Sequence, residues 1–175
     1  MKLKFIPWNS KPRTMLRYLK PGHIFALQLD ATRFAFGRII ATPTAGTPAE
    51  FFDIIKDSPV LGEDEISAAQ RLIHPLIIDA YSLFDRRILG NWQMIALQED
   101  FIAHDAAQIF FWYGDPIGGY KKTNALGETI GLIPESEAKT MQDAGLSGDR
   151  YVRFHILKVL NEISTMPEVP LLHPA

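Results

Sequence analysis

Residues 114–123 come closest of any segment to a known ligand-binding motif. They read GDPIGGYKKT after an apolar run, which nearly matches the GxxxxGK[ST] phosphate-binding loop. Such a loop needs its lysine directly after the last glycine, because the backbone N–H groups and the lysine converge on one pair of phosphates. Here Tyr120 separates Gly119 from Lys121, and no helix is expected to follow. We therefore interpret the segment as a hairpin turn or a surface loop.

Histidine and cysteine, the side chains that most often bind metals, give no recognisable pattern. No two histidines have the i,i+4 spacing of a helical zinc site, and HExxH is absent. The chain has no cysteine, which excludes disulfides, thiol catalysis, CxxC redox chemistry and cysteine-bound zinc. We predict no metal site and no cofactor. The histidines are His23, His74, His104, His155 and His173.

Two carboxylates interrupt apolar segments that are expected to form strands. Asp53 lies within residues 51–55 and Asp79 within residues 76–84. A buried carboxylate without a partner is costly, so each needs an ion pair or an exposed position. Arg38, on a neighbouring predicted hairpin, is a candidate partner. A hydrolase would use such carboxylates, together with a histidine, as general acid and base; without a surrounding motif we favour a structural role.

The sequence contains no motif of a serine nucleophile, and it gives no further support for phosphate binding. Residues 145–149 read GLSGD and miss the GxSxG nucleophile motif by one position. Ser147 is better interpreted as the N-cap of the last helix. Aromatic side chains are frequent, and tryptophan and tyrosine are favoured binding anchors. Trp112, Tyr113 and the adjacent Asp115 therefore form one candidate partner-binding set.

Length, charge and hydropathy restrict the class of protein. The chain has 175 residues, 47% of them hydrophobic and 22% charged, which is typical of a single globular domain. Eighteen basic and 20 acidic residues give a formal net charge of -2, which favours neither nucleic acid nor an anionic membrane as partner. No signal peptide and no membrane-length apolar run is evident, so we expect a cytoplasmic protein.

Periodicity predicts an α+β fold in a single domain of residues 1–175. A strongly bent, mainly antiparallel sheet or a partial barrel is expected, with one inserted helix and further helices at the C-terminus. Residues 1–19 are expected to be an N-terminal extension with a short helical turn, residues 42–50 a loop, and residues 165–175 a tail. Residues 120–134 carry one or two weak strands at most. The predicted strands are 25–29, 34–40, 51–55, 76–84, 91–97 and 108–113, and the predicted helices are 63–73, 135–144 and 148–163.

Three segments resemble the immunity protein 26 family. Residues 20–29 (KPGHIFALQL) and 33–40 (RFAFGRII) are similar to the family's opening hairpin, and residues 90–96 (GNWQMIA) to its tryptophan strand. His23 stands where the family usually has aspartate, and Ala96 where we would expect glycine. The residues that carry the resemblance are Gly22, Phe36, Gly37, Arg38 and Trp92.

The resemblance implies a protein of a bacterial polymorphic-toxin system that binds a cognate toxin domain and neutralises it. It implies no catalysis and no cofactor, and it carries over no interface residues, because partner surfaces in such families vary. Two alternatives from the residues stay open. One is a small enzyme with a distributed carboxylate and histidine site, and the other is a ligand-binding or structural β-module. The oligomeric state is not predicted.

An acidic segment is the second candidate partner-binding set. Asp57, Glu63, Asp64 and Glu65 form the densest acidic stretch, at the predicted start of the inserted helix. An inhibitor of a nuclease toxin would gain from acidic groups, because opposite charge speeds the encounter with a basic surface. The same residues also suit a solvated helix start, where carboxylates favour the positive end of the dipole.

Overall fold

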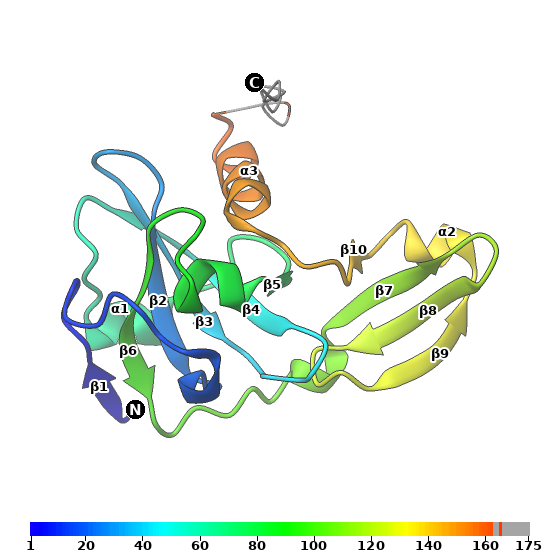
Figure 1. Cartoon of the computed structure of the whole chain (residues 1–175), viewed down its shortest axis with the longest axis horizontal. Coiled ribbons are helices and arrows are strands. Elements are labelled where there is room, and N and C mark those ends of the chain that lie inside the picture. Colours follow the sequence, from blue (N-terminus) through cyan, green and yellow to red (C-terminus); the bar gives the residue numbers. More distant parts are fainter. Residues whose placement is uncertain (163–164, 166–175) are drawn as a thin grey trace.

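The computed structural model describes residues 1–162 and 165 and contains two open sheets. The larger sheet has six antiparallel strands in the order β1-β6-β2-β3-β4-β5 (Figure 1). The chain is thus α+β with mainly antiparallel pairing, as predicted, and the described strands do not close into a barrel. The six strands are β1 (Leu3–Phe5), β2 (His23–Gln28), β3 (Phe34–Ile39), β4 (Thr47–Lys56), β5 (Leu76–Ile78) and β6 (Trp92–Gln98).

The predicted hairpin between β2 and β3 is confirmed. Ala26 faces Phe36 across the pair, and Ile24 faces Arg38. The turn is closed by Asp30, whose Oδ1 accepts the N–H groups of Thr32 and Arg33 at 2.9 Å each. A short carboxylate that accepts nearby backbone N–H groups is a common way to stabilise a turn.

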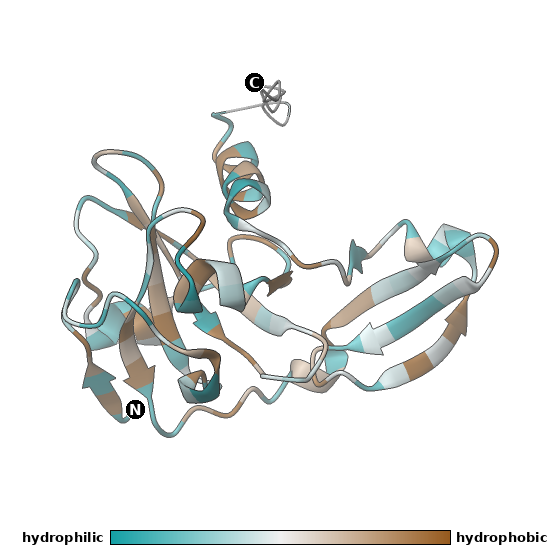
Figure 2. Ribbon diagram, viewed as in Figure 1, coloured by the Kyte–Doolittle hydropathy of each residue, from teal (hydrophilic) through white to brown (hydrophobic). Residues whose placement is uncertain are grey.

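Both faces of the larger sheet are buried, and successive side chains contribute to opposite faces. Phe25, Phe51 and Trp92 lie in one apolar cluster, which is covered by η2 (Tyr81–Asp85) and by α3 (Asp149–Val159). Phe36 and Phe52 lie in a second cluster on the other face, beneath α1 (Glu63–Ala68). Apolar residues accordingly follow the strands of this sheet in Figure 2.

The smaller sheet projects from the larger one as an arm (Figure 1). Its order is β10-β7-β8-β9, and a third apolar cluster, which contains Phe111, Ile40 and Ile77, joins the two sheets. One face of the arm is covered by α2 (Glu135–Ala138), from which Glu137 binds Lys122 at 3.0 Å. The strands are β7 (Phe110–Asp115), β8 (Gly119–Asn124), β9 (Thr129–Ile133) and β10 (Gln142–Asp143).

Residues 76–84 were predicted as one strand, and this is wrong. Strand β5 ends at Ile78, and a π-helical turn, η2, follows from Tyr81 to Asp85. Asp79 changes the direction of the chain, because its Oδ1 accepts the Ser82 N–H at 3.2 Å. The apolar residues of η2 are buried as fully as those of a strand would be, so burial alone could not distinguish the two structures.

Two other predictions in the first half were wrong. Residues 47–50 belong to β4 and not to a loop, and α1 ends at Ala68 rather than near residue 73. The helix ends early because the backbone after it bonds to β4. The Asp53 N–H donates to the Gln70 carbonyl at 2.9 Å, and the Leu72 N–H donates to the Phe51 carbonyl at 2.8 Å.

The two helices predicted near the C-terminus are present, but their bounds and the N-cap of the second one differ from the prediction. Helix α2 is shorter than predicted, and α3 has Gly148, not Ser147, at its N-cap. Ser147 is buried, and its N–H donates to the Ile77 carbonyl at 2.7 Å, which extends the pairing of β5. The predicted tail, apart from Thr165, lies outside the described residues.

The remaining elements are short. Strand β1 pairs with the end of β6, and the predicted helical turn near residue 16 is η1 (Leu16–Tyr18). The loop after β6 contains η3 (Ala106–Gln108). None of the helices in the described part of the chain is long and apolar enough to cross a membrane.

We predict that Gly37→Ala destabilises the fold. A Cβ atom at residue 37 would lie 2.5 Å from Cζ of Phe25 and closer still to the Glu50 carbonyl oxygen. Overpacking of this kind costs about 1–3 kcal/mol of the free energy of unfolding, which urea titration would measure. The control is Gly118→Ala, whose Cβ would have its nearest neighbour at 3.6 Å. Equal stability of the two variants would contradict the prediction.

Candidate functional site

An apolar groove lies between β1 and α1. Its volume is about 320 Å³, and Ile95 and Ala96 of β6 line it together with side chains from both neighbouring segments. Phe5 and Val60 are 54% and 60% exposed, so the groove presents apolar surface to solvent. The other lining residues are Ile6, Pro7, Trp8, Pro59, Leu61 and Ile66.

Pairing of the chain after β1 with β6, together with side-chain packing, fixes the positions of the two walls of the groove. The Ile6 N–H donates to the Ile95 carbonyl at 2.7 Å, so the chain after β1 runs beside β6. Trp8 then packs edge-on against Phe34, with ring centroids 5.3 Å apart. On the other wall, Leu61 and Ile66 are buried in the cluster beneath α1. The groove therefore joins the N-terminal segment to the inserted helix.

Acidic side chains lie on the segment that forms one wall of this groove. Asp57, Glu63 and Asp64 are exposed, and within the described structure none of them forms an ion pair. The segment that carries them also supplies Val60 and Leu61 to the groove wall. We call the groove and these three carboxylates the acid-rimmed groove.

Glu65, the fourth acidic candidate, is used by the fold. Its carboxylate accepts the Gly62 N–H at 2.7 Å and a bond from Lys56 Nζ at 2.8 Å. These two bonds, the Gly62 N–H first, hold the pKa of Glu65 below its usual value. Glu65 thus stabilises the start of α1 and neutralises a nearby lysine.

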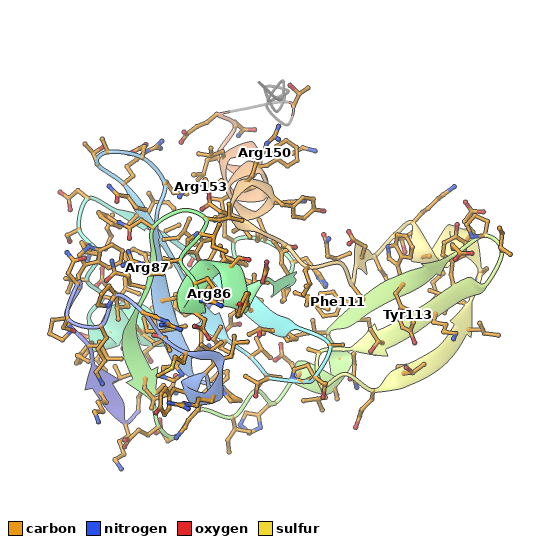
Figure 3. All side chains as sticks on the ribbon, viewed as in Figure 1. Arg86, Arg87, Phe111, Tyr113, Arg150 and Arg153 are labelled. Atoms are coloured by element: carbon orange, nitrogen blue, oxygen red, sulfur yellow. The ribbon has the colours of Figure 1, made fainter. Side chains whose placement is uncertain are left out.

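The other candidate set lies at the opposite end of the molecule, on the arm (Figures 1 and 3). Trp112 donates its indole N–H to the Met141 carbonyl at 3.1 Å, and Asp115 accepts the N–H groups of Ile117 and Gly118 at 2.7 Å each. Both side chains therefore have structural contacts. Tyr113 is 38% exposed and lines a separate cleft between the arm and the larger sheet. The structure does not bring the two candidate sets together.

Gly22, a signature residue, connects the start of β2 with its neighbouring strands, and His23 follows it. Gly22 has φ +87°, and its carbonyl and N–H bond to Gln98 and Ile39 at 2.9 Å each. A side chain at this position would collide with the Gln98 carbonyl. His23 is buried, and its Nδ1 accepts the Lys20 N–H at 2.9 Å. Like an aspartate, this histidine offers an acceptor to a backbone N–H.

Phe36 and Trp92, also signature residues, are buried on opposite faces of the larger sheet. The Trp92 indole N–H donates to Asp149 at 2.7 Å, and Arg153 Nε donates to the same carboxylate at 2.8 Å. These contacts attach α3 to β6. Phe36 and Trp92 thus have structural roles.

Arg38 belongs to a buried ion network that the sequence did not predict. Its Nε donates to Glu50 at 2.7 Å, and Arg71 Nε donates to the other Glu50 oxygen at 2.7 Å. The Glu50 side chain is only 5% exposed. Arg38 therefore pairs with Glu50 and not with Asp53. Asp53 is exposed and accepts the Gln70 N–H at 2.8 Å.

Arginines also lie on the elements that cover the face of the larger sheet opposite α1. They come from the loop after η2 and from the first turns of α3 (Figure 3). Charge is therefore distributed unevenly, with exposed carboxylates near α1 and arginines near α3. The sequence carried no signal for this, because the two arginine pairs lie far apart along the chain. They are Arg86, Arg87, Arg150 and Arg153.

One cleft does bring a histidine and a carboxylate together, as an enzyme would require. His74 and Asp105 both line it, but Arg71 binds Asp105 and lowers its pKa. Burial lowers the pKa of His74, whose Nε2 lies 3.3 Å from the Phe110 carbonyl. Neither carboxylate expected from the sequence lines this cleft. Among residues 1–162, no three His, Asp or Glu side chains gather in a way that could hold a metal ion.

Comparison with known proteins places the chain in a family of immunity proteins. The model of that family, immunity protein 26, matches residues 20–123, and the chain belongs to it. The match includes all five signature residues, the acidic segment and the whole of β7. No curated protein and no solved structure matches the chain.

We predict that Glu50→Gln is strongly destabilising. Removing this charge leaves Arg38 without its ion pair and Arg71 with Asp105 only, and breaking a buried pair in this way costs about 3–5 kcal/mol of the free energy of unfolding. Asp105→Asn is the control, because the Asp105 side chain is 50% exposed and an exposed pair contributes only about 0.2–1 kcal/mol. Chemical denaturation of both variants measures the difference, and a loss of similar size in both would show that burial of Glu50 does not matter.

We also predict that stability falls as the pH drops below 6.5. Burial lowers the pKa of His23, His74 and His155 from 6.5, so the unfolded chain binds protons more readily than the folded one. Their contribution is present above pH 6.5 and is lost as the pH falls toward the lower folded-state pKa values. His23→Asn keeps an acceptor for the Lys20 N–H and should flatten the dependence of the melting temperature on pH. The exposed His104→Asn serves as control, and an unchanged slope in His23→Asn would contradict the prediction.

Proposed function

We propose that this protein is a non-catalytic immunity protein that acts in the cytoplasm by binding a toxin domain. Membership of the immunity protein 26 family supports the role, and the acid-rimmed groove supplies a surface suited to it. The partner is a cognate toxin domain of a polymorphic-toxin system, and the mode of action is stoichiometric occlusion of that domain. Neither nucleic acid nor a membrane takes part in this binding.

The acid-rimmed groove is the main support for the proposal, because it combines the apolar centre and the polar edge of a protein interface. Its apolar centre, with Phe5 and Val60 exposed, provides area that gains free energy when water is excluded. Its edge provides charge that is still available, since Asp57, Glu63 and Asp64 form no ion pair with other described residues. An apolar centre with a polar edge is the usual arrangement of such surfaces.

The charge of the edge indicates the chemistry of the partner. A toxin domain that acts on nucleic acid presents a basic surface to its substrate. Exposed carboxylates accelerate association with such a surface, and added salt weakens this acceleration. Binding there would cover the basic substrate surface of the toxin.

We predict that Asp57→Lys, Glu63→Lys and Asp64→Lys, combined, slow association with the cognate toxin domain. Loss of electrostatic steering is expected to lower the association rate constant about 10-fold or more at low salt. Stopped-flow or biolayer interferometry measures the rate constant, and thermal unfolding checks that the fold is intact. Glu65 is left unchanged because it stabilises α1.

A matched control reverses the same kind of charge at another helix start. Glu135→Lys and Glu137→Lys alter the first turn of α2, on the arm. This variant should associate at close to the wild-type rate. If it slows association more than the reversal near α1, the toxin binds the arm and the acid-rimmed groove is not the interface.

Removing apolar area from the groove is expected to have a different kinetic effect from reversing its charges. Val60→Ser removes exposed apolar area without changing charge, so it should raise the dissociation rate constant and leave association nearly unchanged. Surface plasmon resonance at fixed salt separates the two constants. Ile102→Ser, at a 67% exposed residue outside the groove, is the control. A dissociation rate unaffected by Val60→Ser would exclude the apolar part of the interface.

A further inference from the structure

The first 29 residues are basic although the chain as a whole is slightly acidic. They contain no aspartate and no glutamate, and the first carboxylate side chain of the sequence is that of Asp30. A segment with charges of one sign attracts groups of the opposite sign to its surroundings. The basic residues of this segment are Lys2, Lys4, Lys11, Arg13, Arg17 and Lys20.

Part of this basic segment lines a cavity of about 230 Å³, to which β2 and β6 also contribute. Every polar side chain that lines the cavity can donate a hydrogen bond, and none of them is a carboxylate. The cavity therefore offers donors and positive charge, a combination that suits an anion. The polar lining residues are Lys11, Arg13, Thr14, Tyr18 and His23.

His23 supplies a buried donor to this cavity. The residue is only 8% exposed, and its Nδ1 accepts the Lys20 N–H at 2.9 Å. Because Nδ1 accepts a bond, the proton of the neutral ring lies on Nε2. No described residue bonds to Nε2, and no side-chain nitrogen or oxygen without a partner is sealed inside the described structure. Nε2 therefore reaches the cavity, where an acceptor would satisfy it.

The two charged side chains of the cavity are only partly used by the fold. Arg13 donates from Nε and Nη2 to Oδ1 of Asp85, at 3.1 and 2.7 Å, and this carboxylate offsets its charge. The remaining nitrogen, Nη1, has no hydrogen-bond partner among the described residues. Lys11 is exposed and forms no ion pair with any described residue. The cavity thus keeps a net positive charge.

We propose that this cavity binds a phosphate group, which accepts bonds from His23 Nε2, Lys11 Nζ and Arg13 Nη1. Three donors from separate positions along the chain suit the several oxygens of a phosphate better than the two oxygens of a carboxylate. The cavity is smaller than the clefts that hold drug-sized ligands, so the ligand is a small one. Ile6 and Met94 complete the lining, and they would contact the organic part of a phosphate ester.

The phosphate site shares one residue with the acid-rimmed groove. Ile6 lines both, so a bound phosphate would hold the N-terminal segment that forms one wall of the groove. Binding of phosphate requires no toxin domain, however. The inference therefore stands apart from the proposed function, and either can fail without the other.

Titration of the full chain with inorganic phosphate, and separately with phenyl phosphate, tests the proposal by NMR of the histidine imidazoles. The Nε2 resonance of His23, assigned by its loss in His23→Asn, should move and saturate with at least one of the two compounds. The resonance of His104, an exposed residue outside the cavity, should not move. Tighter binding of phenyl phosphate supports an ester as ligand, and equal affinity supports the free ion. A His23 resonance that moves with neither compound, or only together with that of His104, overturns the proposal.

A pair of lysine variants separates a built site from general attraction to the basic segment. Lys11→Ala should weaken binding of phosphate about 10-fold or more, because it removes one charge-assisted hydrogen bond. Lys4→Ala is the matched control, since Lys4 is an exposed lysine of β1 that does not line the cavity. Thermal unfolding without phosphate checks that both variants fold. An equal loss of affinity in the two variants would show that phosphate only collects around the segment, and it would overturn the proposal.

Discussion

The buried carboxylate of Glu50 is the constraint on which the centre of this structure depends. Its two oxygens accept bonds from Arg38 on β3 and from Arg71 in the segment after α1. Arg38 also binds Gln98 at the end of β6, so a single side chain joins three strands. A buried charge must be paired in this way, and removal of one partner leaves the other unsatisfied. The network therefore sets the position of β4 relative to β3 and to the segment that follows α1.

The Glu50 network also affects the acid-rimmed groove, because Arg71 belongs to the segment that follows α1. Arg71 reaches Glu50 only because residues 70–72 bond to the edge of β4, and this pairing ends α1 at Ala68. A short α1 leaves its acidic first turn beside the groove. The inserted segment is thus held at both ends, by Glu65 at its start and by Arg71 after it. The exposed groove lies on a rigid support, which keeps the cost of ordering low when a partner binds.

The sequence predicted those elements whose pattern depends on local chemistry. The β2–β3 hairpin follows from alternation and from the Asp30 turn, and the family resemblance rested on residues that prove to be structural, such as Trp92. It could not predict contacts between distant segments. Glu50 lies in a stretch of loop-like composition, and its partner Arg71 is 21 residues away. The groove was missed for the same reason, because Phe5 and Val60 meet only when β1 pairs with β6. For residues 76–84, a strand and a π-helical turn bury the same apolar residues.

The net charge of -2 does not show that some acidic groups are bound by other side chains or backbone groups whereas others are not. Glu50, Glu65 and Asp149 each accept bonds that hold one element to another. Their charge is largely neutralised by the arginine or lysine that binds them. Asp57, Glu63 and Asp64 have no such partner among the described residues, so their field extends into solvent. Among the described residues, the carboxylates that the fold does not use lie on the segment beside the apolar groove, so a nearly neutral chain still presents a local negative field there.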